Sequence, residues 1–448
     1  MNKIKKISLL LVSFTFMYTG TIMAQETEVA KVTGENGIIN FKSNDGDYKW
    51  SFGGRAYMDG TYYMEDATDL SSKTNLSDVR LYAKASWKKW EAKINFSFAE
   101  NEVHAKDIYL KYNLSDNSYL KVGNFYEPFG IQGSISSKDS KFIGNSFSGE
   151  AFGIGRTVGI GYTTFSNRYF VSGGLFGSEI GNTKKGDAGY SVTAKAVYSP
   201  IVEDNMNFHV GASASYRLPD ANGYDEKYND DEYNREVIYA AGPEHKFLNA
   251  VVDHAGNELK LNAQLLGTYG RFMIQSEYYS NKVYRKSNYE LQFEHSTPDM
   301  WGWPSSSQDL EDWYGKQRDI KTDGYYVQAG YLIKGDNYSY NSSSAFLNRP
   351  KAGSVELLVR LNQTNLNDID GIFMQDKFWD ADPIKAASGQ TNFSVGGGES
   401  IDYSLGLNYY VNNNVMFRLN YTYMDIDNVY FRQDDKISFV KARIQVNF

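Results

Sequence analysis

The residue types that most often do chemistry are scattered in this sequence. It contains no cysteine, and Asp368-Ile369-Asp370-Gly371 resembles only part of a calcium loop, in residues that are ordinary in turns. Serine is too common to single out a nucleophile beside an oriented base. The five histidines show no close metal-ligand spacing: His104, His209, His245, His254 and His295. The sequence therefore gives little support to an enzyme and implies no cofactor.

The other available chemistry is charge repeated at every second residue. Asp78, Arg80 and Lys84 alternate with Val79 and Leu81, as the two faces of a strand do. Such charges would be costly against a packed core, whereas a water-filled channel accommodates them. A soluble sheet would turn the same polar face outward, so alternation alone does not decide between the two.

On this basis about 14 basic side chains share the polar face of the predicted strands with about 8 acidic ones. The basic set is Arg55, Arg80, Lys84, Lys93, Lys111, Lys121, Lys195, Arg217, Lys260, Arg271, Arg360, Arg418, Lys441 and Arg443. The acidic set is Asp59, Asp78, Glu91, Asp107, Glu258, Glu277, Glu356 and Asp402. Fixed positive charge in a narrow channel concentrates anions. The alternative, in which these cations only pair with the carboxylates, stays open.

One long insert, residues 126–156, separates two predicted strands. At about 30 residues it is well beyond a hairpin loop, and Phe129, Ile131 and Phe142 are not needed by a freely solvated one. We expect it to fold into the lumen of a closed barrel and narrow the passage. An outer loop packed on its neighbours is the alternative.

Charged residues in this insert are candidates for the constriction. Lys138, Lys141 and Arg156 outnumber Asp139 and Glu150 by one, a weak basic preference. Glu127 is expected at the root of the loop, where it would anchor the loop to a basic wall residue.

Sixteen strands position these groups. They are expected at about 50–63, 77–87, 90–98, 104–113, 118–125, 157–165, 168–176, 190–199, 206–217, 257–267, 271–283, 323–334, 355–365, 401–411, 415–424 and 437–448. Tight connections alternate with long ones, the rhythm of an even transmembrane barrel. The connection at 335–354 is an exception, because it is long although it falls on the side where short periplasmic turns are expected.

The two ends of the chain support an exported barrel. Residues 1–24 carry Lys3, Lys5 and Lys6 before an apolar run, the layout of a signal peptide, and 25–49 form a polar periplasmic leader before a barrel over 50–448. The composition has 36 Tyr, 26 Phe and 8 Pro, which suits strands with aromatic girdles. The last strand alternates and stops on Phe448, which resembles an outer-membrane assembly signal.

Several of these segments also carry a family resemblance. The run VGNFYEPFG, then SSKDSKF and GRTVGIGY, resembles the phosphate-selective porin O and P family, and four further segments fit in order between about Phe52 and Phe448. The resemblance implies a sixteen-stranded barrel, usually trimeric, with an inward-folded third loop. It does not carry over the identity of the solute.

We therefore predict an all-β protein, a passive outer-membrane porin for small hydrophilic solutes that favours anions such as phosphate. The alternatives are a sugar or nutrient channel with little charge selectivity, a barrel enzyme, and a closed structural or receptor barrel. Expected partners are outer-membrane lipid, lipopolysaccharide and the barrel-assembly machinery. The acidic stretch from Asp220 to Glu236 is interpreted as a solvated outer loop. A net charge of −8 argues against nucleic acid.

Overall fold

A computed structural model of the chain describes residues 30–35, 37–64, 70–99, 102–223, 235–243, 247–285, 318–369, 395–427 and 435–448. The expected signal peptide, residues 1–24, and most of the acidic stretch between Asp220 and Glu236 lie outside these residues. Among the described residues, no helix is both long and apolar enough to cross a membrane.

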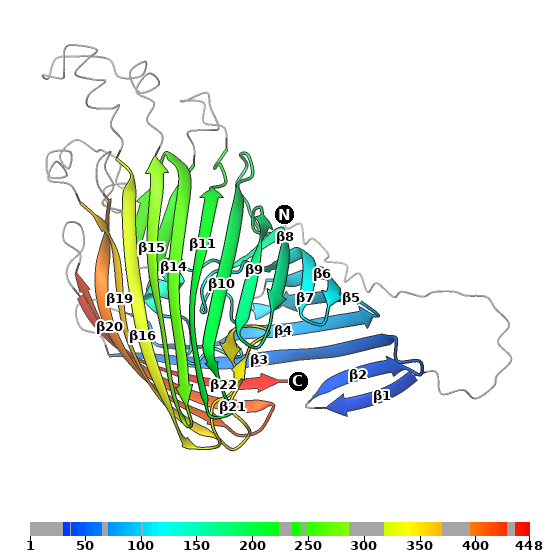
Figure 1. Ribbon diagram of the computed structural model, residues 1–448. Coiled ribbons are helices and arrows are strands. Elements are labelled where there is room, and N and C mark those ends of the chain that lie inside the picture. The colour runs from blue at the N-terminus through cyan, green and yellow to red at the C-terminus, as the bar shows by residue number, and fades with distance from the viewer. Residues whose placement is uncertain are drawn as a thin grey trace, which may run out of the picture.

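Within the described residues, sixteen antiparallel strands pair in chain order and close into a barrel (Figure 1). They are β3 (Tyr48–Met64), β4 (Lys73–Trp87), β5 (Trp90–Ser97), β6 (His104–Ser115), β7 (Ser118–Tyr126), β8 (Arg156–Phe165), β9 (Tyr169–Phe176), β10 (Tyr190–Val202), β11 (Met206–Leu218), β14 (Ala255–Tyr269), β15 (Phe272–Arg285), β16 (Ile320–Lys334), β19 (Val355–Asp368), β20 (Val395–Tyr410), β21 (Val415–Asp427) and β22 (Asp435–Asn447). The predicted all-β fold class and the sixteen antiparallel barrel strands are confirmed.

The barrel closes where the last strand meets the first. β22 pairs with β3 from Ser438 opposite Met64 to Asn447 opposite Arg55. Phe448 then continues the ladder, because its N–H donates to the Gly54 carbonyl at 2.9 Å and its own carbonyl accepts from the Gly54 N–H. A Cβ on Gly54 would lie 2.7 Å from the Phe448 ring, so this close approach requires glycine.

Side chains along the strands alternate between two environments. Over most of β10, β20 and β21, buried residues alternate with exposed or half-buried ones. The exposed set is apolar, including Leu81, Ile94, Val122 and Ile160, while the buried set is largely polar. An apolar outer face around a polar interior is the pattern of a membrane barrel.

A hairpin that the sequence did not predict lies within the expected leader. β1 (Ala30–Glu35) and β2 (Ile38–Ser43) pair with each other, and β2 extends the sheet beside the first residues of β3 (Figure 1). Phe41 opposes Trp50 and packs edge-on against Phe52, so apolar contacts hold the hairpin to the wall.

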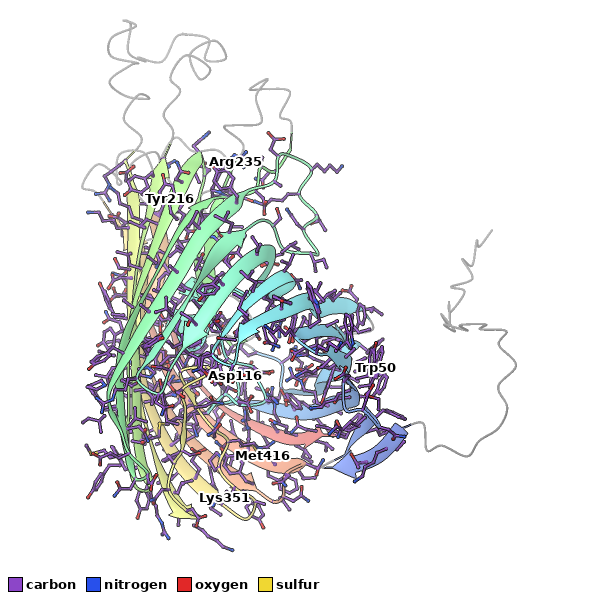
Figure 2. All side chains as sticks on the ribbon, turned by 45° about the vertical axis from the view of Figure 1, so that its right-hand side comes forward. Trp50, Asp116, Tyr216, Arg235, Lys351 and Met416 are labelled. Carbon is purple, nitrogen blue, oxygen red and sulfur yellow. The ribbon has the colours of Figure 1, made fainter. Side chains whose placement is uncertain are left out.

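Three further inserts carry short elements. Helix α1 (Phe147–Phe152) lies between β7 and β8, and Ser146 caps it by accepting from the Gly149 N–H. Hairpin β12 (Val237–Ala241) and β13 (Leu248–Val252) lies between β11 and β14, and β17 (Tyr340–Asn341) pairs with β18 (Phe346–Leu347) between β16 and β19. Arg235 and Lys351 mark opposite ends of the barrel (Figure 2).

Two sequence assignments change. Arg271 was expected on the polar face of a strand, but it is exposed in the turn before β15, because β14 continues to Tyr269. Arg156 was expected in the loop, but it is the first residue of β8 and pairs with Tyr126 of β7.

Candidate functional site

Three carboxylates on neighbouring strands of the inner wall each bind two cationic side chains. Asp78 binds Arg55 at 2.5 Å and Arg80 at 2.6 Å; Glu91 binds Lys84 at 2.9 Å and Lys111 at 3.0 Å; Asp107 binds Lys93 at 2.8 Å and Arg156 at 2.7 Å. Six cations thus share three carboxylates over β3 to β8. The cations therefore do pair with carboxylates, which was one of the two interpretations of the sequence. The pairing still leaves an excess of positive charge on this part of the inner wall, which we call the basic wall.

Lys121 on β7 adds another positive charge to the basic wall. Among the described residues it has no carboxylate within ion-pair distance. Its Nζ instead lies 4.7 Å from the ring centre of Tyr109, 5.1 Å from that of Phe125 and 5.3 Å from that of Tyr119. Aromatic faces attract a cation without neutralising its charge. Lys121 therefore stays available to an anion.

A cavity of about 750 Å³ lies against the basic wall. Among the described residues, nine basic side chains and three acidic ones line it. The basic ones are Arg55, Arg80, Lys84, Lys93, Lys121, Lys138, Arg156, Lys195 and Arg349, and the acidic ones are Asp107, Glu127 and Asp139. A chain that is acidic overall thus lines this cavity with cations.

Residues 127–155, between β7 and β8, contact strands far around the barrel. The backbone N–H groups of Ile131 and Gln132 donate to Glu277 of β15 at 2.6 and 3.0 Å. Lys141 pairs with Glu356 of β19 at 2.7 Å. Both carboxylates are fully buried.

Further hydrogen bonds hold the same segment to the strands near the barrel seam. Arg418 of β21 donates to the Ser140 carbonyl at 2.6 Å, and Gln445 of β22 donates to the Lys138 carbonyl at 3.2 Å. Arg55 of β3 donates to the hydroxyl of Ser136 at 3.1 Å. The 127–155 segment therefore leaves the wall at β7 and is bonded to the wall at β15, β19, β21, β22 and β3.

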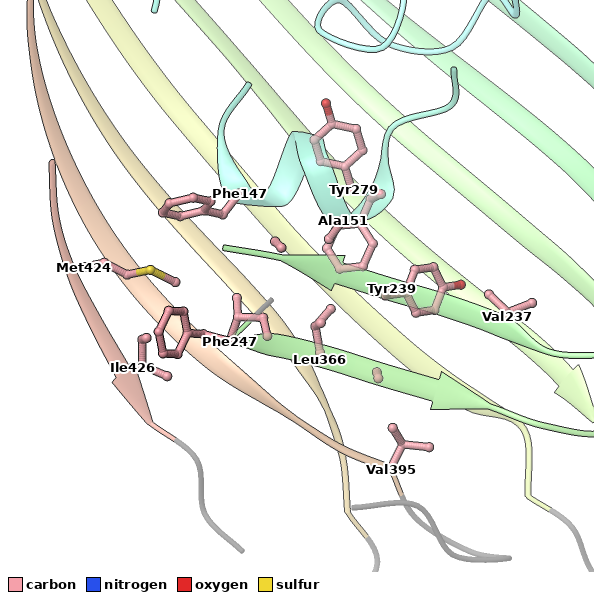
Figure 3. Close-up of a cluster of buried hydrophobic side chains, with 14 of the residues drawn as sticks. Phe147, Ala151, Val237, Tyr239, Phe247, Tyr279, Leu366, Val395, Met424 and Ile426 are labelled. Atoms are coloured by element: carbon pink, nitrogen blue, oxygen red, sulfur yellow. The ribbon is translucent and has the colours of Figure 1, made fainter. Parts of the chain in front are cut away.

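Apolar side chains fill the space between α1 and the wall (Figure 3). Phe152 lies 5.4 Å from Tyr239 of β12 and 6.1 Å from Tyr279 of β15, measured between ring centres. Phe129 packs on Tyr279 at 6.4 Å. These contacts explain why an insert rich in Gly and Ser also carries aromatic residues.

Residues 335–354 enter from the opposite end of the barrel to the β12–β13 hairpin. Tyr338 donates its hydroxyl to Glu356 at 2.6 Å, and the Tyr340 hydroxyl lies 3.0 Å from His209 Nδ1. The Phe346 ring lies 4.9 Å from Lys195 Nζ and lines the 750 Å³ cavity. The 335–354 connection is therefore long because it packs against the inner wall of the barrel.

The structure separates the predicted site residues into two groups. Those on the 750 Å³ cavity are Arg80, Lys84, Lys121, Glu127, Lys138 and Arg156. Lys141, Arg418 and Arg443 do not line it, because Lys141 pairs with Glu356, Arg418 holds Ser140, and Arg443 binds both oxygens of Asp59 at 2.7 Å.

Glu127 lies at the root of the segment and is fully buried. Its carboxylate accepts from Arg217 of β11 at 2.9 Å and from Thr193 of β10 at 2.6 Å. Lys195 and Arg349 were not singled out as site residues. Lys195 was placed on the inner face by alternation, but no local pattern marks Arg349, which lies beyond β18.

A closed sixteen-stranded barrel with a polar interior and an apolar outer face defines the class: a transmembrane β-barrel. In a comparison with known protein families, residues 52–448 match the family described as "Phosphate-selective porin O and P". The chain belongs to this family of porins, and its barrel is an outer-membrane barrel.

The chain is also similar to individual proteins. Porin O of Pseudomonas aeruginosa is 21% identical over 468 residues, which cover 96% of this chain and 95% of that protein. Two solved structures share the fold at 11% identity and a TM-score of 0.51: an anion-selective porin from Comamonas acidovorans, covering 90% of this chain and 100% of the other, and the outer membrane channel DcaP of Acinetobacter baumannii, covering 91% and 99%.

Proposed function

We propose that this porin passes small hydrophilic solutes and favours anions such as phosphate. The observation that carries the proposal is the sharing of Asp78, Glu91 and Asp107 by six cations, beside Lys121. Had each cation its own carboxylate, the wall would be neutral. The excess positive charge attracts anions and repels cations, most strongly where water is scarce. The names of the Porin O relative and of the anion-selective neighbour agree with this preference.

The narrowest passage is proposed to lie between the basic wall and the 127–155 segment. Lys138 supports this, because it is exposed and lines the 750 Å³ cavity from the segment, whereas Arg80 and Arg156 line the cavity from the wall. An anion passing here would meet positive charge on both sides. Lys141 contributes by fixing the segment to Glu356 and not by meeting the solute.

Planar-bilayer recording with purified protein tests the proposal. Stable open channels are expected, and the reversal potential under a potassium chloride gradient should have the sign of chloride preference. A zero reversal potential would favour a nutrient channel without charge selectivity. That alternative has one observation behind it, since Tyr82, Tyr109, Tyr119 and Tyr126 line the same cavity and could stack on sugars. A current carried mainly by potassium would reject the anion proposal.

The assembled state proposed is a homotrimer inserted by the barrel-assembly machinery and bordered by lipopolysaccharide. OmpT of Vibrio cholerae, a solved barrel of the same fold at 10% identity and a TM-score of 0.52, is described in a trimer form, covering 90% of this chain and 99% of the other. Electrophoresis without boiling, combined with crosslinking, should give a band of three chains. A single-chain band under both conditions would reject the trimer.

A further inference from the structure

Arg360, on the inner face of β19, is a buried cation whose guanidinium has no hydrogen-bond partner among the described residues. Arg360 is only 8% exposed to solvent. Two of its guanidinium nitrogens, Nε and Nη1, are buried and have no hydrogen-bond acceptor among the described residues. The contact that it does make is with the Phe142 ring, whose centre lies 4.4 Å from the Arg360 Cζ. Burying a charge without a partner is strongly unfavourable, so the site calls for a compensating group.

A carboxylate on the wall, Asp402, attracts Arg360 electrostatically, but the two make no hydrogen bond or ion pair among the described residues. Asp402 lies on the neighbouring strand β20, but the register places it opposite Asn362 and places Arg360 opposite Ser404. Asn362 donates to one oxygen of Asp402 at 2.6 Å and accepts from Ser148 of α1, while the other Asp402 oxygen has no partner among the described residues. Asp402 therefore serves the bond network beneath α1.

Arg360 lines a second cavity, of about 330 Å³, on the other side of the 127–155 segment. Among the described residues, the other charged side chains that line it are Lys441 of β22 and Glu150 of α1. Phe142 and Asn145 of the segment form one boundary, and the turn at Gly242 before β13 forms another. A water molecule takes up about 30 Å³ of liquid, so the cavity has room for a small anion with part of its hydration shell.

We propose that this cavity binds one small inorganic anion, a halide or phosphate, at the guanidinium of Arg360. Arginine suits the task because its charge is permanent, weakly hydrated and presented with several N–H donors. The site is separate from the basic wall: none of its charged lining touches the 750 Å³ cavity. It deepens the proposed function by adding a second anion site, and it needs only that anions reach the lumen.

Crystals of the full chain grown in sodium bromide test the proposal directly. Anomalous diffraction should show a bromide within hydrogen-bonding distance of Arg360, and adding inorganic phosphate should displace it. Arg360→Gln should abolish that peak, whereas Lys121→Gln, which changes the basic wall, should leave it in place. Asp402→Asn should raise the bromide occupancy, because the neighbouring carboxylate repels the anion.

Three results would overturn the inference. One is wild-type crystals without bromide at Arg360. Another is a direct or water-bridged pair between Arg360 and Asp402 in those crystals. The third is a peak that survives Arg360→Gln. The first two results come from wild-type crystals, so the proposal can be rejected even if Arg360→Gln folds poorly. A bromide at Arg360 together with a zero reversal potential would reject the anion-preferring porin and keep this site.

Discussion

Lys121 on β7 lies directly opposite Lys111 on β6, and of the two only Lys111 has a carboxylate partner among the described residues. Lys111 shares Glu91 with Lys84, while Lys121 is enclosed by aromatic rings. Lys121 also lines the 750 Å³ cavity, which Lys111 does not. Two lysines at the same height of the wall thus differ in their surroundings: Lys121 lines the cavity without a carboxylate partner in the described part of the chain, and Lys111 is paired and lies outside the cavity lining.

Replacing Lys121 with Gln should lower the chloride-to-potassium permeability ratio. A unit charge about 4 Å from an ion is worth about 1 kcal/mol in water-like surroundings, which corresponds to roughly a fivefold change. Reversal potentials in a salt gradient measure it. Lys111→Gln is the matched control and should have a smaller effect, because its charge is partly balanced by Glu91. Equal effects of the two substitutions would show that the place of Lys121 on the cavity, without a carboxylate partner, is irrelevant to selectivity.

Replacing Lys141 with Met should loosen the 127–155 segment. The substitution leaves Glu356 as a buried carboxylate without its cation, and breaking one partner of a buried pair costs about 3–5 kcal/mol. Single-channel recordings should show larger and noisier conductance.

The double variant Lys141→Met with Glu356→Gln should recover quiet channels, since no buried charge then remains unpaired. Lys138→Met is the control for the segment, because Lys138 is exposed and makes no ion pair among the described residues. Wild-type noise in Lys141→Met, or the same noise in Lys138→Met, would contradict the anchoring role.

The wall could be predicted from the sequence because lipid outside and water inside impose a period of two on every strand. Arg80 and Lys93 reach the lumen for this reason alone. Which charges pair could not be predicted, since Asp107 takes one partner from β5 and another, Arg156, that lies 49 residues away along the chain. Such a pair depends on the register of several strands.

The inserts were harder to predict than the wall. Lys141 and Glu356 are 215 residues apart, and nothing local marks either as the partner of the other. The hairpins β12–β13 and β17–β18 are short and sit inside long connections, where alternation over a few residues gives a weak signal. Their burial comes from tertiary contacts such as Tyr340 with His209.

Shortening the β17–β18 hairpin should widen the pore. Replacing residues 340–347 with Asn-Gly keeps Ser339 and Asn348, which already bond across the base of the hairpin, and gives a favourable two-residue turn. The change removes Phe346 from the 750 Å³ cavity and from Lys195. Single-channel conductance should rise while chloride preference is kept. Tyr340→Phe, which removes only the hydroxyl and its hydrogen bonds with His209 and Ser199, is the control. Unaltered conductance in the shortened variant would place the narrowing elsewhere.

Deleting Phe448 should impair barrel insertion far more than deleting Glu28, which lies in the expected leader and outside the described residues. Phe448 extends the seam ladder by two backbone hydrogen bonds to Gly54, and its ring lies against that glycine. The terminal residue thus completes closure of the barrel as well as ending the expected assembly signal.

The amount of folded protein at the cell surface and its heat-modifiable mobility in electrophoresis separate these two roles. If closure matters, Gly54→Val should reduce the folded fraction with Phe448 still present, because a side chain at Gly54 would collide with the Phe448 ring and with the Arg80 carbonyl. If only the assembly signal matters, Gly54→Val should insert normally and the Phe448 deletion should fail alone. Equal surface levels for the Phe448 and Glu28 deletions would reject both roles.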